Sequence, residues 1–185
     1  MEGKITYSRR KSLSLRIAPD GSLDIRAPLG MPRREIDRFL NEKADWIALH
    51  RAQVLRDRQE GARHAIDAEQ LETLKELAQE PIYESLGKFA PQMGVRYGRV
   101  TIRCQKSRWG SCSSAGNLNF NCLLALAPRE VLDYVVVHEL AHRLHMDHSA
   151  AFWQEVEKVL PDYRVRRDWL RKNGGALLAR IGENG

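Results

Sequence analysis

The stretch from Val131 to His148 reads V-L-D-Y-V-V-V-H-E-L-A-H-R-L-H-M-D-H. It places His138 and His142 four positions apart, with Glu139 directly after the first of them. Residues four apart on an α-helix lie on one face about one turn apart, so both imidazoles can bind a single metal ion. Glu139 lies at the edge of that face, where its carboxylate can reach a water molecule on the metal. The pattern therefore predicts a helical metal site with a carboxylate beside it.

The residues before His138 are almost wholly apolar, and this predicts a helix deep in the core. Two histidines and a glutamate are costly to bury in such a helix unless they are paired or bind a metal. A zinc ion with one open position lowers the pKa of its water to about 7 and activates it for attack on a carbonyl. The pattern therefore favours Zn2+ as cofactor and peptide hydrolysis as chemistry, with His138 and His142 as ligands and Glu139 as general base.

A zinc site of this type needs a third protein ligand. We expect His148, because a histidine six residues after the second ligand lies just past the helix end, where the chain can turn back toward the metal. Two alternatives stay open. One is His145, which would lie roughly 10 Å from His138 along a continuous helix. The other is a glutamate of the following helix, Glu155 or Glu157.

The length of 185 residues fits a single domain, which we expect to consist of an N-terminal hairpin-and-helix appendage over 1–60 and a catalytic core over 67–174. No secretory signal precedes the first basic residues, and no apolar run reaches the roughly 18 residues that a membrane span needs. The cysteines are odd in number and sparse, which fits a reducing compartment. We therefore expect a cytoplasmic protein with no membrane partner.

The formal net charge of +6 permits attraction to nucleic acid or to acidic proteins. The basic residues are spread along the chain, however, and no aromatic-interleaved basic motif is present. Solvated basic faces are therefore the favoured interpretation, and nucleic acid remains a possible, unproven partner. The oligomeric state is not predicted.

The hydrophobic periodicity predicts an α+β fold. In the N-terminal third we expect a β-hairpin over 13–27 and a helix over about 33–59, after which Gly61 interrupts the helical pattern. After it we expect a helix over 67–89 that is capped by Asp67 and bent or broken at Pro81, one or two strands within 95–104, a polar loop over 105–116 and a strand over 117–125. The metal-binding helix then begins at Pro128, and it is followed by a helix capped by Asp147 or Ser149 and by a last helix over 163–172 ended by 173–175.

Four further motifs, taken with the histidine block, resemble the bacterial YgjP-like metallopeptidase family, which is related to the SprT-like and WLM zinc peptidases. They are S-R-W-G-S-C-S at 107–113, G-N-L-N-F-N at 116–121, His148-Ser149 with Phe152-Trp153, and P-D-Y at 161–163. The resemblance is strong over about residues 70 to 174 and looser in the N-terminal hairpin. It implies a zincin-like fold in which a small mixed or antiparallel sheet packs on the active-site helix. It also implies a zinc ion and endopeptidase activity on a peptide or protein substrate that it does not identify.

By position, the resemblance implies that His138, His142 and His148 are the ligands and that Glu139 is the base. The loop 108–112 has two interpretations. Either it lies beside the zinc, with Arg108 or backbone amides steadying the substrate or an oxyanion, or it is structural.

In the structural interpretation Trp109 fills the core and Cys112 is a small buried group; Cys112 is a metal ligand only in principle. Tyr134 and Tyr163 are further candidates for oxyanion donors. Zincins in general pair extended substrate with an edge strand, for which residues 117–123 are the candidate. Two other functions stay open: a DNA-associated, SprT-like protease that attacks proteins on nucleic acid, and an inert zinc-binding protein.

Overall fold

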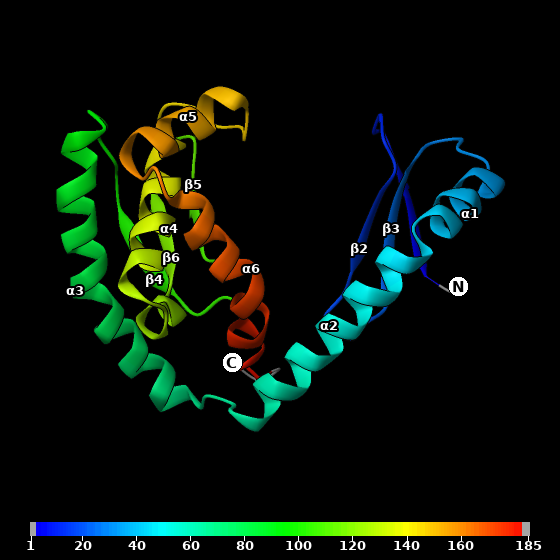
Figure 1. Ribbon diagram of the computed structural model, residues 1–185, viewed down its shortest axis with the longest axis horizontal. Coiled ribbons are helices and arrows are strands. Elements are labelled where there is room, and N and C mark those ends of the chain that lie inside the picture. Colours follow the sequence, from blue (N-terminus) through cyan, green and yellow to red (C-terminus); the bar gives the residue numbers. More distant parts are fainter. Residues whose placement is uncertain (1–2, 183–185) are drawn as a thin grey trace. The chain divides into compact units, whose positions relative to one another are not determined.

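The computed structural model describes residues 3–182 and divides into two compact units, one up to Arg63 and one from His64 onward. Figure 1 shows the helices and strands of both units. The division falls between the two parts expected from the sequence, 1–60 and 67–174. The expectation that they form a single domain with an appendage stays a prediction.

The N-terminal unit is a three-stranded sheet with two helices. Its strands are β1 (Lys4–Ser8), β2 (Ser14–Ile17) and β3 (Leu23–Pro28), in the order β1-β3-β2. The hairpin β2-β3 is antiparallel, as the alternating pattern predicts, while β1 adds in parallel to the other side of β3. The helices are α1 (Arg33–Glu42) and α2 (Ala44–Arg63). Alternate residues of β3 are buried and form a core with apolar residues of both helices.

The second unit begins with α3 (Ala68–Gln92) and contains a three-stranded sheet of β4 (Val100–Arg103), β5 (Gly110–Cys112) and β6 (Leu118–Asn121). The remaining elements are a 3₁₀ helix η1 (Cys122–Leu126), α4 (Arg129–Ala141), α5 (Ala150–Val159) and α6 (Tyr163–Ala179). The strand order is β4-β6-β5, with β4 parallel and β5 antiparallel to β6. The α+β fold class with a small mixed sheet is therefore confirmed.

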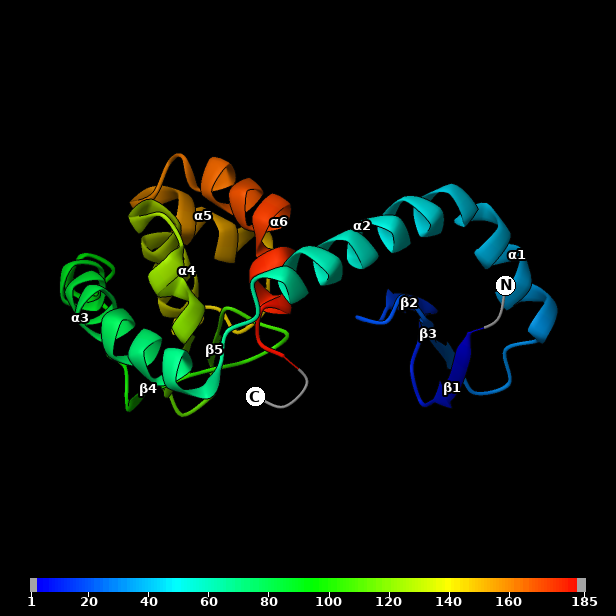
Figure 2. The same cartoon turned by 90° about the horizontal axis from the view of Figure 1, so that it is seen from below.

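Helix α4 is the centre of this unit. It lies between α3 and α6 in both views (Figures 1 and 2) and also contacts α5 and β5. The main core cluster contains residues of α4 together with residues of α3, β6, η1 and α5; those of α4 are Leu132, Tyr134, Val135, Val136, Val137, Leu140 and Ala141. The apolar run before His138 thus does place this helix deep in the core.

Two breaks that the sequence predicts are absent from the described helices. Asp67 caps α3 through a capping box, as expected: its side chain accepts from Gln70 N at 2.8 Å, and its backbone N–H donates to Gln70 Oε1 at 3.0 Å. The helix then continues through Pro81, and α2 continues through the buried Gly61. Packing of the apolar faces outweighs the lost hydrogen bond or backbone entropy at these positions.

The last helix is also longer than expected, because α6 passes through Gly174 instead of ending there. A Cβ at this buried position would lie 3.1 Å from Trp109 Nε1. The glycine therefore makes room for the indole of another segment. It does not terminate the helix.

The predicted strand positions need two corrections. Residues 95–104 contain one strand, β4, which agrees with the one or two expected there, but the strand expected over 117–125 ends at Asn121, where η1 follows. The expected polar loop 105–116 contains β5, a strand too short and too polar to show periodicity. None of the described helices is long and apolar enough to cross a membrane.

Candidate metal centre

Helix α4 ends within the histidine motif, and its end turns the chain back on itself. His142 is the C-terminal cap residue, and the backbone N–H groups of Leu144 and His145 both donate to Ala141 O at 3.0 Å. Asp147 Oδ1 then accepts from Ser149 N at 3.1 Å, and the Ser149 hydroxyl caps α5. Of the two expected caps, Ser149 is therefore the one that starts the helix. This reversal returns the chain to the face of α4 that carries His138.

Three imidazoles converge where the chain turns back. One ligand-type atom from each of His138, His142 and His148 lies within 4.8 Å of the others. The ring centroids are 5.0 Å apart for His138 and His142, 5.0 Å for His138 and His148, and 4.8 Å for the remaining pair. The structure thus brings together the three histidines that the sequence and the resemblance select.

The donor geometry fits a tetrahedral metal ion. Nε2 of His138 and Nε2 of His148 are 3.1 Å apart. Two nitrogens that bind one zinc at about 2.0–2.1 Å with tetrahedral angles lie roughly 3.3–3.4 Å apart. The observed separation is close to that value. His142 is oriented by its other nitrogen, because Nδ1 lies 3.0 Å from His145 O and Nε2 is left for a ligand.

The alternative third ligands lie in other contacts. His145 contributes the backbone carbonyl that orients His142. Glu155 forms an ion pair with Lys158 at 2.6 Å, and Glu157 forms one with Arg164 at 3.7 Å. Neither glutamate belongs to the cluster of potential ligands found among residues 3–182.

An aromatic wall from α5 holds the three imidazoles. The ring of Phe152, which is fully buried, lies 4.9 Å from that of His138, 4.6 Å from that of His142 and 4.9 Å from that of His148. Trp153 stacks on His148 with a centroid distance of 5.9 Å. Phe152 therefore packs on the helix that carries His138 and His142, and it restricts the imidazoles to few orientations.

Burial sets the protonation of the site. Desolvation, together with the neighbouring histidines, lowers the pKa of His138 to about 3, and burial also lowers the pKa of His142. Both imidazoles are therefore neutral near pH 7, which is the form that binds a metal. Desolvation raises the pKa of Glu139 to about 8, and the positive charge of Arg108 opposes this rise.

Glu139 is packed against the neighbouring strand. Its side chain is buried, and Oε2 has no hydrogen-bond partner within the described part of the chain. A Cβ added at Gly110 of β5 would lie 2.6 Å from Glu139 Oε1 and 2.8 Å from its Cγ. Only glycine leaves space for the carboxylate here. Nothing in the sequence indicates this contact, although Gly110 lies in the motif at 107–113.

The loop 108–112 is both structural and adjacent to the site. The buried Asn121 side chain donates to Gln105 O at 2.6 Å and to Arg108 O at 2.8 Å, and accepts from Leu123 N at 3.1 Å. Trp109 packs on Gly174, as described above. These contacts fix the backbone that carries Gly110 against Glu139. Asn121 belongs to the motif at 116–121, but the sequence offers no reason to separate it from Asn117 and Asn119 of the same motif.

The strand expected to be an edge is in the middle of its sheet. Because β6 pairs with both β4 and β5, the expectation that residues 117–123 form a free edge is wrong. The edge nearest the site is β5. Asn121 N donates to Trp109 O at 2.8 Å and Ser113 N donates to Asn117 O at 2.9 Å, so the backbone groups of Gly110 and Cys112 point away from β6.

The two tyrosines occupy different positions. Tyr134 lies one turn before His138 on α4, and their ring centroids are 5.9 Å apart. Its burial raises the pKa of its phenol to about 12, so the hydroxyl remains a donor. The hydroxyl of Tyr163 accepts from Arg164 Nε at 3.3 Å, and its ring stacks on Trp153 at 5.3 Å. Tyr134 is therefore closer to the imidazoles, and the role of each tyrosine stays a prediction.

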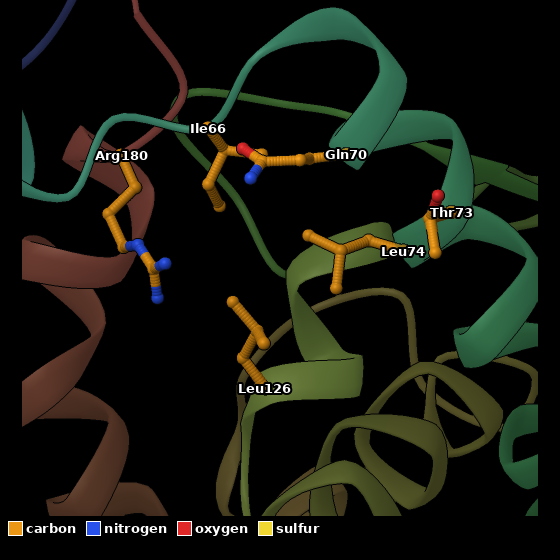
Figure 3. A pocket seen from close by; sticks show the side chains of 6 residues that line it. All are labelled: Ile66, Gln70, Thr73, Leu74, Leu126 and Arg180. Carbon is orange, nitrogen blue, oxygen red and sulfur yellow. The ribbon is translucent and has the colours of Figure 1, made fainter.

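A pocket of about 260 Å³ lies elsewhere in the same unit (Figure 3). It is lined by residues next to or within α3, η1 and the end of α6: Ile66, Gln70, Thr73, Leu74, Leu126 and Arg180. The Arg180 Nε donates to His64 O at 2.9 Å. None of these residues belongs to the histidine cluster, so the pocket is separate from the candidate metal centre.

Comparisons with known proteins agree with the chemistry of this centre. The sequence model of the family described as YgjP-like, metallopeptidase domain, matches residues 11–74 and 55–173. None of the curated proteins matches the chain.

Two solved structures are similar over about half of the chain. One is the metallopeptidase zymogen of Pyrococcus abyssi abylysin, with 28% identity, a TM-score of 0.45, and coverage of 48% of this chain and 90% of that one. The other is the metallopeptidase zymogen of Methanocaldococcus jannaschii jannalysin, with 19% identity, a TM-score of 0.42, and coverage of 49% and 91%. The family match spans most of the sequence, including the three histidines and Glu139. The chain therefore belongs to the YgjP-like family of metallopeptidases.

Proposed function

We propose that this metallopeptidase is a zinc endopeptidase in which His138, His142 and His148 hold the metal and Glu139 is the general base. The observation that carries this proposal is the convergence of three imidazoles, two of them with Nε2 atoms 3.1 Å apart, beside a buried carboxylate. Imidazole nitrogens suit zinc as well as copper, iron and nickel, and three of them around an open fourth position are typical of catalytic zinc. A bound zinc ion lowers the pKa of water and polarises a carbonyl oxygen.

Within this chemistry, the chain's residues orient groups and move protons. The backbone carbonyl of His145 and the Phe152 ring hold the imidazoles in the orientation that binds metal. Desolvation makes Glu139 a stronger proton acceptor, and in its carboxylate form it takes a proton from the attacking water and delivers it to the leaving amine. Gly110 leaves the carboxylate in place beside the site. Tyr134, still a phenol at neutral pH, is the nearer of the two candidate oxyanion donors.

The free edge of β5 is the proposed binding place for an extended peptide. The backbone N–H and C=O groups of Gly110 and Cys112 point away from β6 and offer two donors and two acceptors to a peptide. Gly110 also lies against Glu139, so this peptide would run beside the carboxylate. Pairing through backbone groups binds peptide with little regard to sequence. This edge supports endopeptidase action on an unfolded or extended substrate.

The test is a comparison of wild type with Glu139→Gln, using a mixed set of internally quenched peptides and elemental analysis of both proteins. The amide keeps the shape of the side chain and cannot accept the proton. We expect both proteins to hold about one zinc per chain and only wild type to cleave. Equal cleavage by Glu139→Gln would exclude Glu139 as the base, and absence of any bound metal in wild type would exclude the zinc proposal.

A cytoplasmic location is also part of this proposal. It is supported by the free thiols of Cys104, Cys112 and Cys122, which form no disulfide in the described structure. An interaction with nucleic acid, or action on nucleic-acid-bound proteins, stays a prediction that rests on the net charge alone.

A further inference from the structure

A guanidinium from α6 lies next to the aromatic wall of the metal centre. The Cζ atom of Arg167 lies 4.9 Å from the centroid of the Trp153 ring. That ring is in turn 5.8 Å from the ring of His138 and 5.9 Å from the ring of His148. Arg167 is exposed, so the stacking fixes its position while the charged group stays accessible to a ligand.

Arg167 differs from the other arginines of α6 in having no acidic partner. Arg164 pairs with Glu157 at 3.7 Å, Arg166 with Asp162 at 3.0 Å, and Arg171 with Asp168 at 3.3 Å. Within residues 3–182, no carboxylate lies within ion-pair distance of Arg167. Its charge is thus available for an external anion.

A second unpaired guanidinium approaches the site from a different element. Arg108 precedes β5 and is exposed, while Asn121 fixes its backbone carbonyl at 2.8 Å. It likewise has no ion-pair partner in the described part of the chain. It stands two positions before Gly110, where an added Cβ would lie 2.6 Å from Glu139 Oε1, and its charge opposes the burial that raises the pKa of that carboxyl. Similarly, burial is the main cause that lowers the pKa of His138, and the charge of Arg167 contributes in the same direction.

We propose that Arg167, with Arg108, selects peptides that carry an acidic side chain close to the scissile bond. This inference rests on the proposed function and specifies the substrate class of that site. The guanidinium of Arg167 lies no more than about 11 Å from the His138 ring, because the Trp153 ring bridges the two. An extended peptide advances roughly 3.3 Å per residue. A Glu or Asp side chain two or three residues from the cleaved bond can therefore reach this charge.

The test uses the zinc-loaded full chain and internally quenched peptides that differ at one position, with Glu, Gln or Lys placed up to three residues on either side of the bond. We expect wild type to prefer Glu over Gln at one or more positions by about 2- to 5-fold in kcat/KM, the range of an exposed ion pair. Arg167→Glu should abolish this preference or shift it toward Lys. The matched control is Arg171→Glu, which makes the same charge change one turn further along α6 and should keep the wild-type preference.

A binding measurement separates this inference from the proposed function. The Kd of labelled, uncleaved Glu and Gln peptides is measured by fluorescence anisotropy on the Glu139→Gln variant. We expect the Glu peptide to bind more tightly than the Gln peptide, and this difference should disappear when Arg167→Glu is added. If wild type cleaves no peptide, the endopeptidase proposal fails while the Kd series still decides the inference.

Three results would overturn the inference. The first is equal kcat/KM for Glu, Gln and Lys peptides at every position. The second is an equal loss of preference in the Arg167 and Arg171 variants, which would show that the preference depends on the overall charge of the protein and not on Arg167. The third is a loss of affinity for a labelled single-stranded oligonucleotide in Arg167→Glu with peptide preference intact, which would assign the guanidinium to phosphate.

Discussion

Replacing Gly110 by alanine should disable catalysis without removing the metal. The added Cβ would lie 2.6 Å from Glu139 Oε1 and 2.9 Å from its Cδ. To reach ordinary van der Waals contact at 3.4 Å, the carboxylate must move by about 0.8 Å. Because the surroundings of Glu139 are closely packed, this displacement moves the base away from its working position.

A misplacement of about 1 Å of a catalytic group costs roughly 100-fold in rate. We therefore expect Gly110→Ala to lower kcat by about 30- to 100-fold and to destabilise the fold by about 1–3 kcal/mol through overpacking. Zinc content should be unchanged, since the three atoms nearest to the new methyl group all belong to Glu139 and none to a histidine. The assay is kcat on a quenched peptide, with zinc measured on the same sample and stability measured by urea unfolding.

Gly87→Ala is the matched control. Gly87 lies within α3, and an added Cβ would meet nothing within 4 Å. It should leave kcat unchanged. If Glu139→Gln is inactive while Gly110→Ala keeps the wild-type kcat, the close contact between Gly110 and Glu139 does not position the base.

Three further predictions concern stability and thiol chemistry. Gly87→Ala should raise the free energy of unfolding by about 0.5–1 kcal/mol, because alanine is the better helix former; a lower urea midpoint would contradict this. Asn121→Ala should cost about 2–4 kcal/mol, since it leaves the carbonyls of Gln105 and Arg108 without their donor. Asn173→Ala is its control, because it also removes an amide that donates to a backbone carbonyl, but at an exposed position. It should change the free energy of unfolding by no more than about 0.5 kcal/mol in the same urea assay. Burial and the adjacent Cys104 thiol raise the pKa of Cys122 to about 12 from 9.0. The folded state therefore favours the protonated thiol, and this contribution is complete below pH 9 and is lost as the pH rises from there toward 12. Iodoacetamide at pH 8 should alkylate Cys122 far more slowly in the native than in the unfolded protein, and equal rates by mass spectrometry would refute the assignment.

The metal centre could be predicted because its signal is local. Four-residue spacing on an apolar helix determines the relation of His138 to His142, and a short interval limits where His148 can lie. The same reasoning predicted the hairpin of the N-terminal unit and the cap at Asp67, which depend on neighbours along the chain.

The surroundings of the site could not be predicted, because they depend on contacts between distant segments. Gly110 and Glu139 are far apart in sequence, and nothing in a polar loop indicates a strand that packs on a helix. Gly174 was interpreted as a helix end for the same reason, since the indole that it accommodates comes from Trp109. The middle position of β6 likewise depends on β5, which has too few residues to show alternation.

Arg167 illustrates a third limit. It is one of several basic residues in α6, and the sequence gives no reason to separate it from Arg164, Arg166 or Arg171. Only the ion pairs of those neighbours and the stacking on Trp153 distinguish it. On this basic helix, the arginine available to a ligand is therefore identified by the absence of an ion pair among the described residues, which the sequence does not show.

The most direct test of the account is X-ray absorption at the zinc edge on the zinc-loaded protein. We predict one zinc per chain with three imidazole nitrogens at about 2.0–2.1 Å, and one imidazole fewer in His148→Ala. A protein that retains no zinc, or a zinc bound through sulfur or with an unchanged spectrum in His148→Ala, would contradict it.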